Sequence, residues 1–217
     1  MKTRVLSITI ALYTLVISCS APVSPSNKQP GKIIGGGCDG CELMYINLPK
    51  QMAAVDTSAG WNSGGQPLRI SGKVLKADGK TLAPGVIIYY WQTDKEGYYA
   101  NREGLDARAR RHGYIRGWMK TGADGRYILY TIRPAPYPND SLPAHIHLSI
   151  KEPDLPNEYY TDEINFEDDP LLKPYFKKYP PENRGGSGVV RVSLMNSMQV
   201  AEHHIVLGLN IPGYPDK

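Results

Sequence analysis

Two histidines, His145 and His147, lie two residues apart in the segment P-A-H-I-H-L-S-I at 143–150. Apolar residues alternate with them, and this period of two is typical of a β-strand that directs both imidazoles to one face. Two nitrogen donors on one strand face are a common part of a metal site, and the chain has only five histidines. A single strand histidine is more often a hydrogen-bonded, partly buried residue, so the pair alone leaves both interpretations open.

Two tyrosines upstream lie in segments that extend this pattern. Tyr99 ends W-Q-T-D-K-E-G-Y-Y at 91–99, and Tyr137 lies in D-G-R-Y-I-L-Y-T-I-R-P-A-P-Y-P at 124–138. Together with P-A-H-I-H at 143–147, these segments follow the order of motifs in the intradiol ring-cleavage dioxygenases. The chain resembles that family from about residue 68 to residue 170, and the three ordered motifs make the resemblance specific.

The resemblance implies a mononuclear non-haem Fe(III) held by Tyr99, Tyr137, His145 and His147. Ferric iron favours anionic oxygen ligands, and two phenolates would cancel much of its charge. Zinc is the usual rival for an H-x-H strand, but it draws on Cys, His and carboxylates, and no such third ligand is near this motif. Tyr98 is the alternative to its neighbour Tyr99, and the spacing from the start of the motif favours Tyr99.

The activity implied by the resemblance is oxidative opening of a catechol-type ring between its two hydroxylated carbons. Dioxygen would be the co-substrate and a muconate-type diacid the product. Tyr137 would be the catalytic residue, because it matches the family ligand that leaves the metal and takes a substrate proton. Tyr99, His145 and His147 would remain as ligands.

Three candidate substrate contacts depart from the family pattern. Leu142 stands where the family usually has an arginine that stabilises charge developing on the substrate. Glu163 aligns with a family glutamine, and its carboxylate would repel an acid group on the substrate unless it is protonated or paired. Arg133 is the candidate substitute for the missing guanidinium. We therefore expect a neutral or unusual catechol rather than protocatechuate.

The sequence is also compatible with two other functions. A non-catalytic, prealbumin-like binding lipoprotein is one, because the glycine and valine pattern at 72–86 also occurs in binding modules and a fold alone does not fix activity. A member that binds iron but has lost catalysis through Leu142 and Glu163 is the other.

Around these motifs the sequence predicts an all-β fold, an antiparallel β-sandwich of the prealbumin-like, intradiol dioxygenase type with long loops. The expected strands cover 68–75, 85–92, 113–120, 126–132, 145–150, 161–166, 188–194 and 202–209. Asp-Gly turns at 78–79 and 124–125 predict that the first two strands form one hairpin and the next two a second. Six prolines make 151–187 mostly loop, with one helical turn near 171–179.

The N-terminus predicts export and lipidation. Residues 1–18 have a charged start, an apolar run too short to span a bilayer and the sequence V-I-S before Cys19, which resembles a bacterial lipoprotein signal. Cleavage there would leave Cys19 as the lipid acceptor, followed by a flexible tether over 19–37 and one domain over 38–217. We therefore expect a lipid-anchored protein of the bacterial cell envelope, facing the periplasm or the exterior, with an ordinary secretory leader as the alternative.

Cysteine spacing and charge complete the sequence evidence. Cys38 and Cys41 predict a short disulfide, because a lone C-x-x-C in an oxidising compartment lacks the second pair that a zinc knuckle needs. The formal charge is +4, and the sequence has no long basic run, so we expect no nucleic-acid partner. Nothing in the pattern specifies an oligomer interface, although a homo-oligomer is compatible with it.

Overall fold

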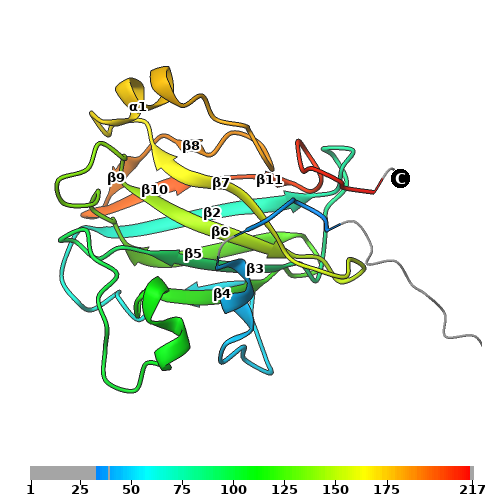
Figure 1. The fold of residues 1–217 in the computed structure, drawn as a ribbon, viewed down its shortest axis with the longest axis horizontal. Helices are drawn as coiled ribbons and strands as arrows, with labels where there is room; N and C mark the ends of the chain where they lie inside the picture. The colour runs from blue at the N-terminus through cyan, green and yellow to red at the C-terminus, as the bar shows by residue number, and fades with distance from the viewer. Residues whose placement is uncertain (1–32, 39, 216–217) are drawn as a thin grey trace, which may run out of the picture. The chain divides into compact units, whose positions relative to one another are not determined.

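The computed structural model describes residues 33–38 and 40–215, all of which belong to one compact unit over residues 32–217. Strands dominate this unit, and they form two sheets (Figure 1). The elements in chain order are η1 (Cys41–Tyr45), β1 (Val55–Thr57), β2 (Pro67–Leu75), β3 (Ile87–Gln92), η2 (Ala107–His112), β4 (Arg116–Lys120), β5 (Arg126–Ile132), β6 (His145–Lys151), β7 (Tyr159–Phe166), α1 (Leu172–Lys178), β8 (Val189–Val190), β9 (Ser193–Met195), β10 (Met198–Glu202) and β11 (Ile205–Val206).

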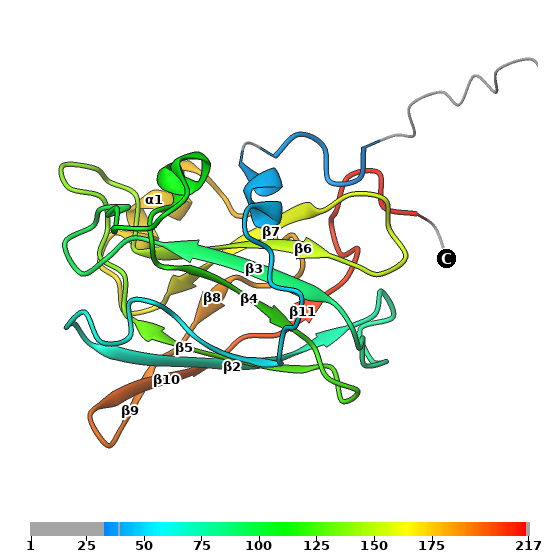
Figure 2. The same cartoon turned by 90° about the horizontal axis from the view of Figure 1, so that it is seen from below.

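One sheet has the strand order β1-β5-β2-β10-β9, with β11 also pairing with β2, and the other has the order β4-β3-β6-β7-β8. The two sheets lie face to face in the view of Figure 2, and most of the apolar core fills the space between them. Strand β2 shows why the layers pack: its burial alternates along the strand, and Leu68, Ile70 and Val74 are fully buried. Each such side chain contributes about 1.5–3 kcal/mol through burial.

The expected all-β fold with a helical turn near 171–179 is confirmed, but two details of the prediction are wrong. The sheets are not purely antiparallel, since β1 pairs with β5, β10 and β11 pair with β2, and β8 pairs with β7 in parallel. Neither expected hairpin forms, because β2 pairs with β5 and β3 pairs with β4. Each Asp-Gly turn instead carries the chain from one sheet to the other.

The turn at Asp78-Gly79 forms as its composition predicts. The backbone N–H of Lys76 donates to the carbonyl of Thr81 at 2.7 Å, and Leu75 bridges Leu82. Gly79 has a φ of 67°, a conformation that favours glycine. The residues of the turn determine its geometry. The strand that follows pairs in whichever sheet can bury its apolar face.

The outer face of the second sheet, which has the strand order β4-β3-β6-β7-β8, is also covered. Segment η1 lies over the sheet, where the Trp118 indole donates to the carbonyl of Met44 at 2.7 Å. Met44 packs with Tyr89 and Trp91 in a small second cluster. Strand β3 is therefore buried on both faces over Ile88 to Gln92, unlike the alternating β2.

The predicted signal, Cys19 and most of the tether lie outside the described residues. Within the part of the chain that the structure describes, no helix has the length and apolar character needed to cross a bilayer.

Candidate metal centre

Four side-chain donor atoms converge on one point of the outer face of the second sheet. The Tyr99 hydroxyl lies 2.6 Å from the Tyr137 hydroxyl and 2.8 Å from Nε2 of His147. The ring closes through Nε2 of His145, which is 3.2 Å from the Tyr137 hydroxyl and 3.0 Å from Nε2 of His147. The structure thus brings together all four residues that the sequence motifs singled out.

Strand β6 positions the two imidazoles. His145 is its first residue and His147 its third, so the period of two directs both rings to the same face. The face opposite is apolar, and Ile146 and Leu148 lie fully buried in the core between the sheets. Moving the strand by one residue would bury the imidazoles and expose the apolar residues, so core burial fixes the orientation of the site.

The two tyrosines come from loops that are tied to each other. The carboxylate of Asp94 accepts from the backbone N–H groups of Glu96 and Tyr98, both at 3.0 Å, which turns the chain toward Tyr99. Backbone and side-chain bonds then join this loop to Ala135, whose N–H donates to the Asp94 carbonyl at 3.0 Å and whose carbonyl accepts from the Thr93 hydroxyl at 2.7 Å.

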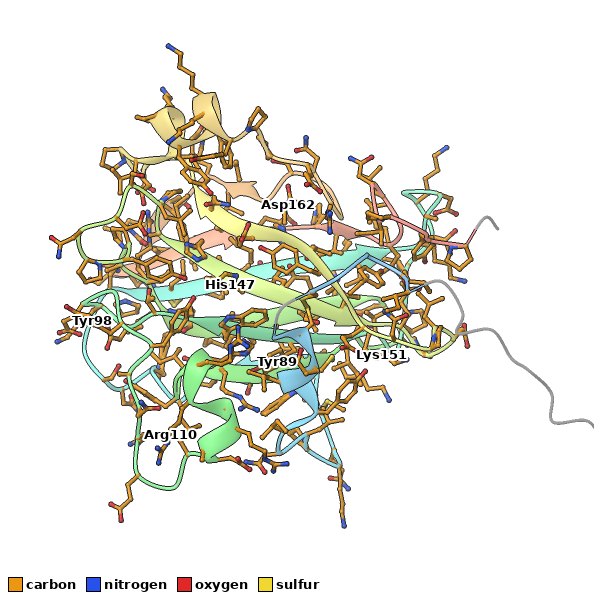
Figure 3. The ribbon with its side chains drawn as sticks, in the orientation of Figure 1. Tyr89, Tyr98, Arg110, His147, Lys151 and Asp162 are labelled. Atoms are coloured by element: carbon orange, nitrogen blue, oxygen red, sulfur yellow. A yellow bond between two sulfur atoms is a disulfide. The ribbon has the colours of Figure 1, made fainter. Side chains whose placement is uncertain are left out.

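Gly97 is required where these two loops meet. It has a φ of 88°, and a Cβ there would lie 2.2 Å from the carbonyl oxygen of Pro136. The glycine of the first motif therefore lets the Tyr99 loop approach the loop that carries Tyr137. Tyr98, the alternative ligand, points away: it is 58% exposed and lies at the margin of the molecule in Figure 3.

The tautomer of His145 is set by a hydrogen bond. Its Nδ1 lies 2.7 Å from the carbonyl of Pro143, which can only accept, so Nδ1 carries the proton. The lone pair on Nε2 is therefore free to act as a ligand, an arrangement that is usual for metal-binding histidines.

A stack of three rings supports His147 from the side. The rings of Trp91 and His147 are 4.7 Å apart and 11° from parallel, and those of Trp91 and His112 are 4.1 Å apart and 3° from parallel. Nδ1 of His112 in turn lies 2.8 Å from the Tyr89 hydroxyl. No sequence motif indicated His112, because this residue reaches the stack from η2, a separate segment.

Burial shifts the pKa values of His147, Tyr99 and Tyr137. It lowers the pKa of His147 well below the usual value, and the neighbouring imidazoles His145 and His112 lower this pKa further. Burial likewise raises the pKa of Tyr99, and the hydrogen bond to Tyr137 and the charge of Glu163 add to this rise. The pKa of Tyr137 is also raised, mainly by burial.

This donor set fits a hard, highly charged cation. His147 is held neutral and ready to ligate, while the two phenols need a nearby positive charge before they can ionise at neutral pH. Among the described residues, no group of three or more His, Cys, Asp or Glu side chains is placed to hold a metal ion, so any ion at the two histidines would depend on the tyrosines. Two phenolic oxygens with two imidazole nitrogens suit Fe(III) better than Zn²⁺.

Glu163 reaches the site through a β-bulge. In the pairing of β6 with β7, Ile146 faces Ile164 and Leu148 faces Thr161, so Asp162 and Glu163 both lie opposite His147. A bulge of this kind redirects side chains, and the Glu163 carboxylate comes to lie 3.7 Å from Nδ1 of His147.

The other two candidate substrate contacts lie differently. Leu142 is half-buried in the loop before β6, where its N–H donates to the Asp140 carboxylate at 3.1 Å. The Arg133 guanidinium pairs with Asp168 at 2.7 Å and lies 3.7 Å from the centre of the Phe166 ring. Arg133 is therefore engaged with Asp168 and Phe166, neither of which is one of the four donors.

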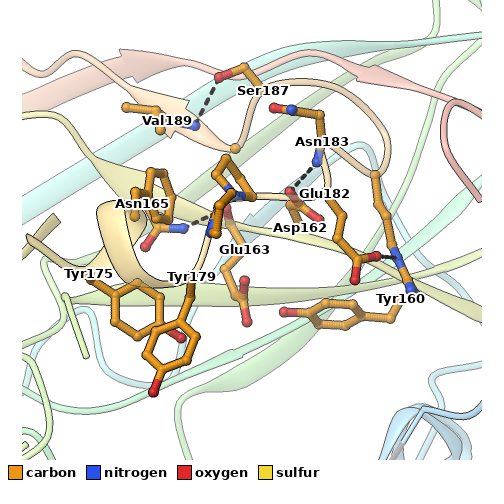
Figure 4. A pocket seen from close by; sticks show the side chains of 15 residues that line it. Tyr160, Asp162, Glu163, Asn165, Tyr175, Tyr179, Glu182, Asn183, Ser187 and Val189 are labelled. Atoms are coloured by element: carbon orange, nitrogen blue, oxygen red, sulfur yellow. Dashed lines mark hydrogen bonds and ion pairs between the residues drawn. The ribbon is translucent and has the colours of Figure 1, made fainter. Parts of the chain in front are cut away.

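Two cavities lie near the site: Tyr99 and His147 line one of them, and Glu163, beside His147, lines the other. A cavity of about 460 Å³ opens on the Glu163 side, where Tyr160, Tyr175 and Tyr179 contribute to its wall (Figure 4). A second, of about 370 Å³, is lined by Trp91, Tyr99, Arg111, His112, His147 and Tyr160, together with Gly37 and Cys38. Cys38 and Cys41 form a disulfide in this part of the chain, with their Cα atoms 5.6 Å apart.

Two tyrosines and two histidines that converge on the outer face of a two-sheet β protein are the arrangement expected for an intradiol dioxygenase. Comparison with known proteins supports the same class. The chain matches the family described as Dioxygenase (Dioxygenase_C) over residues 44–203. This span is most of the chain, and it contains all four donors. The protein therefore belongs to the intradiol dioxygenase family.

Relatives of this chain include aromatic-ring dioxygenases. It is 29% identical over 147 residues to catechol 1,2-dioxygenase 1 of Acinetobacter lwoffii, covering 57% of this chain and 46% of the relative. It is 33% identical over 106 residues to 6-chlorohydroxyquinol 1,2-dioxygenase of Cupriavidus pinatubonensis, covering 41% of this chain and 36% of the relative. The chain thus spans about half or less of the length of these two relatives.

Solved structures share the fold. The dioxygenase domain of a dioxygenase and carbohydrate-binding protein fusion from Streptomyces sp. SirexAA-E has a TM-score of 0.56 at 24% identity, covering 74% of this chain and 91% of that one. The 3-chlorocatechol 1,2-dioxygenase of Rhodococcus opacus has a TM-score of 0.52 at 19% identity, covering 73% and 67%. At these identities the likeness establishes the fold alone.

Proposed function

We propose that this protein is an Fe(III)-dependent dioxygenase that opens a catechol-type ring between its two hydroxylated carbons. The observation that carries the proposal is the closed ring of four donor atoms, from Tyr99, Tyr137, His145 and His147, with neighbouring atoms 2.6–3.2 Å apart. Catechol and O2 together have the composition of the muconate-type diacid, so the reaction needs no other substrate and leaves no other product.

A bound ferric ion would supply positive charge that lowers the pKa of both catechol hydroxyls and an electron-accepting centre beside the ring. The residues of the chain have separate tasks. Tyr99, His145 and His147 hold the ion, and the bond from His145 to the Pro143 carbonyl orients one imidazole. Trp91 covers one face of the His147 ring and keeps water from it.

Tyr137 is the residue placed to move a proton. It lies in a loop rather than on a strand, so it can leave the cluster with less disturbance of the sheet than either histidine. Because burial raises its pKa, its phenolate regains a strong affinity for a proton as soon as it leaves the cation. We assign it the proton of one catechol hydroxyl, which makes it the general base of the reaction.

The test is to load the purified protein with iron and measure two quantities. Ferric tyrosinate absorbs visible light by charge transfer, so the loaded protein should be coloured, and Tyr99→Phe should lose most of that colour. Oxygen uptake with catechol should then be stoichiometric with the formation of a ring-opened diacid. A colourless protein that binds no iron would instead support a binding lipoprotein, and a coloured protein without oxygen uptake would support an iron-binding member that has lost catalysis.

We also propose that the domain is tethered to a membrane of the cell envelope through a lipid on Cys19. The support is the sequence of residues 1–19 alone: a charged start, a short apolar run and a cysteine after V-I-S. A lipid anchor would hold the catalytic domain at the envelope, where a substrate need not cross the inner membrane to reach it.

A further inference from the structure

The wall of the larger cavity carries an excess of negative charge. Asp162, Glu163, Glu182 and Arg184 all contribute to it. Arg184 is paired with Glu182 at 2.5 Å, so the carboxylates of Asp162 and Glu163 are not balanced by a cation of the wall. A charge that is partly shielded from water acts more strongly on a ligand than one on an open surface.

Aromatic rings make up much of the remaining wall. Tyr160, Tyr175, Phe176 and Tyr179 line the cavity, and Figure 4 shows the Glu163 side chain with the rings of Tyr160 and Tyr179 on either side in that view. Ring faces attract cations. Lys178 lies 4.9 Å from the centre of the Tyr179 ring, but its side chain is exposed and is not part of the wall.

The position of Glu163 connects this wall to the proposed catalytic centre. Its carboxylate is 3.7 Å from Nδ1 of His147, and the bulge in β7 directs it there. The charge of Glu163 also contributes to the raised pKa values of Tyr99, Tyr137 and Tyr175, although burial is the larger cause in each. A ring that replaces Tyr137 at the donors would therefore lie within the field of this carboxylate.

The smaller cavity has the opposite character. It contains Arg111, which already has an interaction partner, and it is bounded by Tyr99 and His147, ligands that the proposed reaction leaves in place. Tyr137, the ligand proposed to leave, lines neither cavity, and the charges of Glu163 and Asp140 act on its phenol. A ring bound at the donors in place of Tyr137 would have the Glu163 carboxylate beside it, because that carboxylate is 3.7 Å from Nδ1 of His147.

We propose that Glu163 sets the charge of the substrate, so that the site accepts neutral catechols and catechols with a cationic side chain and rejects catechols that carry a carboxylate. This inference rests on the proposed function for the location of the ring. It requires no second site and no change in the reaction. A carboxylate about 7 Å from Glu163 at an effective dielectric constant near 40 would be disfavoured by a factor of about ten, and an ammonium favoured by a similar factor.

The experiment measures binding without turnover. Iron-loaded protein is titrated under nitrogen at pH 7.5 by calorimetry with catechol, 3,4-dihydroxybenzoate and 4-(2-aminoethyl)catechol. In the unmodified protein we expect the amine to bind at least as tightly as catechol and the acid about tenfold more weakly than catechol. In Glu163→Gln we expect the affinity for the acid, relative to that for catechol, to rise about tenfold, and the affinity for the amine, relative to that for catechol, to fall by a similar factor.

Two variants serve as controls. Glu202→Gln removes the same charge from an exposed position on β10, in the other sheet, and should leave all three affinities unchanged. Arg111→Gln tests the smaller cavity, and if that variant rather than Glu163→Gln alters the preference for charge, the proposal is overturned. Equal binding of the three rings, tightest binding of the acid, or no binding of any ring overturns it as well.

Oxygen uptake with the same three compounds separates this inference from the proposed function. Turnover of catechol with no dependence on substituent charge would leave the function standing and remove the role of Glu163. The expected order of affinities without oxygen uptake for any of the three would retain the role of Glu163 in binding and contradict the proposed reaction.

Discussion

Trp91 and His147 are register partners on neighbouring strands, and their rings stack 4.7 Å apart and 11° from parallel. The same tryptophan stacks on His112, so the His147 imidazole is supported by a column of rings rather than by one contact. This column lies on the covered outer face of the sheet, where the site is shielded from water without interrupting the main core.

Trp91→Leu tests this support. Loss of the ring leaves space beside His147, so we expect the free energy of unfolding to fall by about 3 kcal/mol and iron affinity to fall about tenfold. Trp118→Leu is the matched control, because Trp118 lies on the same face and touches Tyr89 but not His147. Urea denaturation and competition with an iron chelator measure the two effects. Equal loss of iron affinity in both variants would contradict a positioning role for Trp91.

Tyr137→Phe tests the proton transfer. The other three ligands remain, so we expect the protein to retain part of its iron and visible colour, while kcat with catechol falls at least about 100-fold. Tyr98→Phe, at the exposed tyrosine beside Tyr99, should leave iron content and kcat unchanged. Stopped-flow absorption and oxygen uptake provide the measurements. An unchanged kcat in Tyr137→Phe would exclude the assigned role.

Because of His203, we expect the free energy of unfolding to fall in mild acid. It is buried, its Nδ1 lies 2.8 Å from the Tyr127 hydroxyl, and burial lowers its pKa to about 4. The unfolded chain binds a proton at this residue below about pH 6.5, whereas the folded protein does not until about pH 4. The titration of His203 therefore has no effect on the free energy of unfolding above about pH 6.5, and it lowers this free energy by about 3 kcal/mol as the pH drops to about 4.

Unfolding in urea at a series of pH values checks this prediction, with His203→Gln as the test variant and His204→Gln, at an exposed neighbour, as the control. The contribution of His203 is the difference in slope between the unmodified protein and His203→Gln, because other groups also titrate in this range. An unchanged slope in His203→Gln would show that the acid sensitivity arises elsewhere.

Cys19→Ser tests the proposed anchor. Expressed in a bacterial host that processes lipoproteins, the unmodified protein should partition with membranes and incorporate labelled palmitate, and Cys19→Ser should do neither. Cys38→Ser removes another sulfur but not the proposed acceptor, and should remain in the membrane fraction. Palmitate incorporation into Cys19→Ser would contradict the assignment.

The sequence indicated the four donors through the resemblance of three ordered motifs to the dioxygenase family, and its periodicity indicated where most strands lie. The period of two in β6 put both imidazoles on one face, and the glycine of the first motif permitted the close loop contact at Gly97. Side-chain direction along a strand is set within a few positions of the chain. The contact of Gly97 with Pro136 joins two loops, and the sequence supplies only the glycine that permits it.

Strand pairing and the surroundings of the donors depend instead on packing between distant segments. Both expected hairpins were wrong, since burial of two apolar faces against each other separates β2 from β3 and β4 from β5. The bulge that directs Glu163 to His147 and the arrival of His112 on Trp91 likewise join segments far apart in sequence. Such contacts depend on how distant elements fill the same space, which no local pattern specifies.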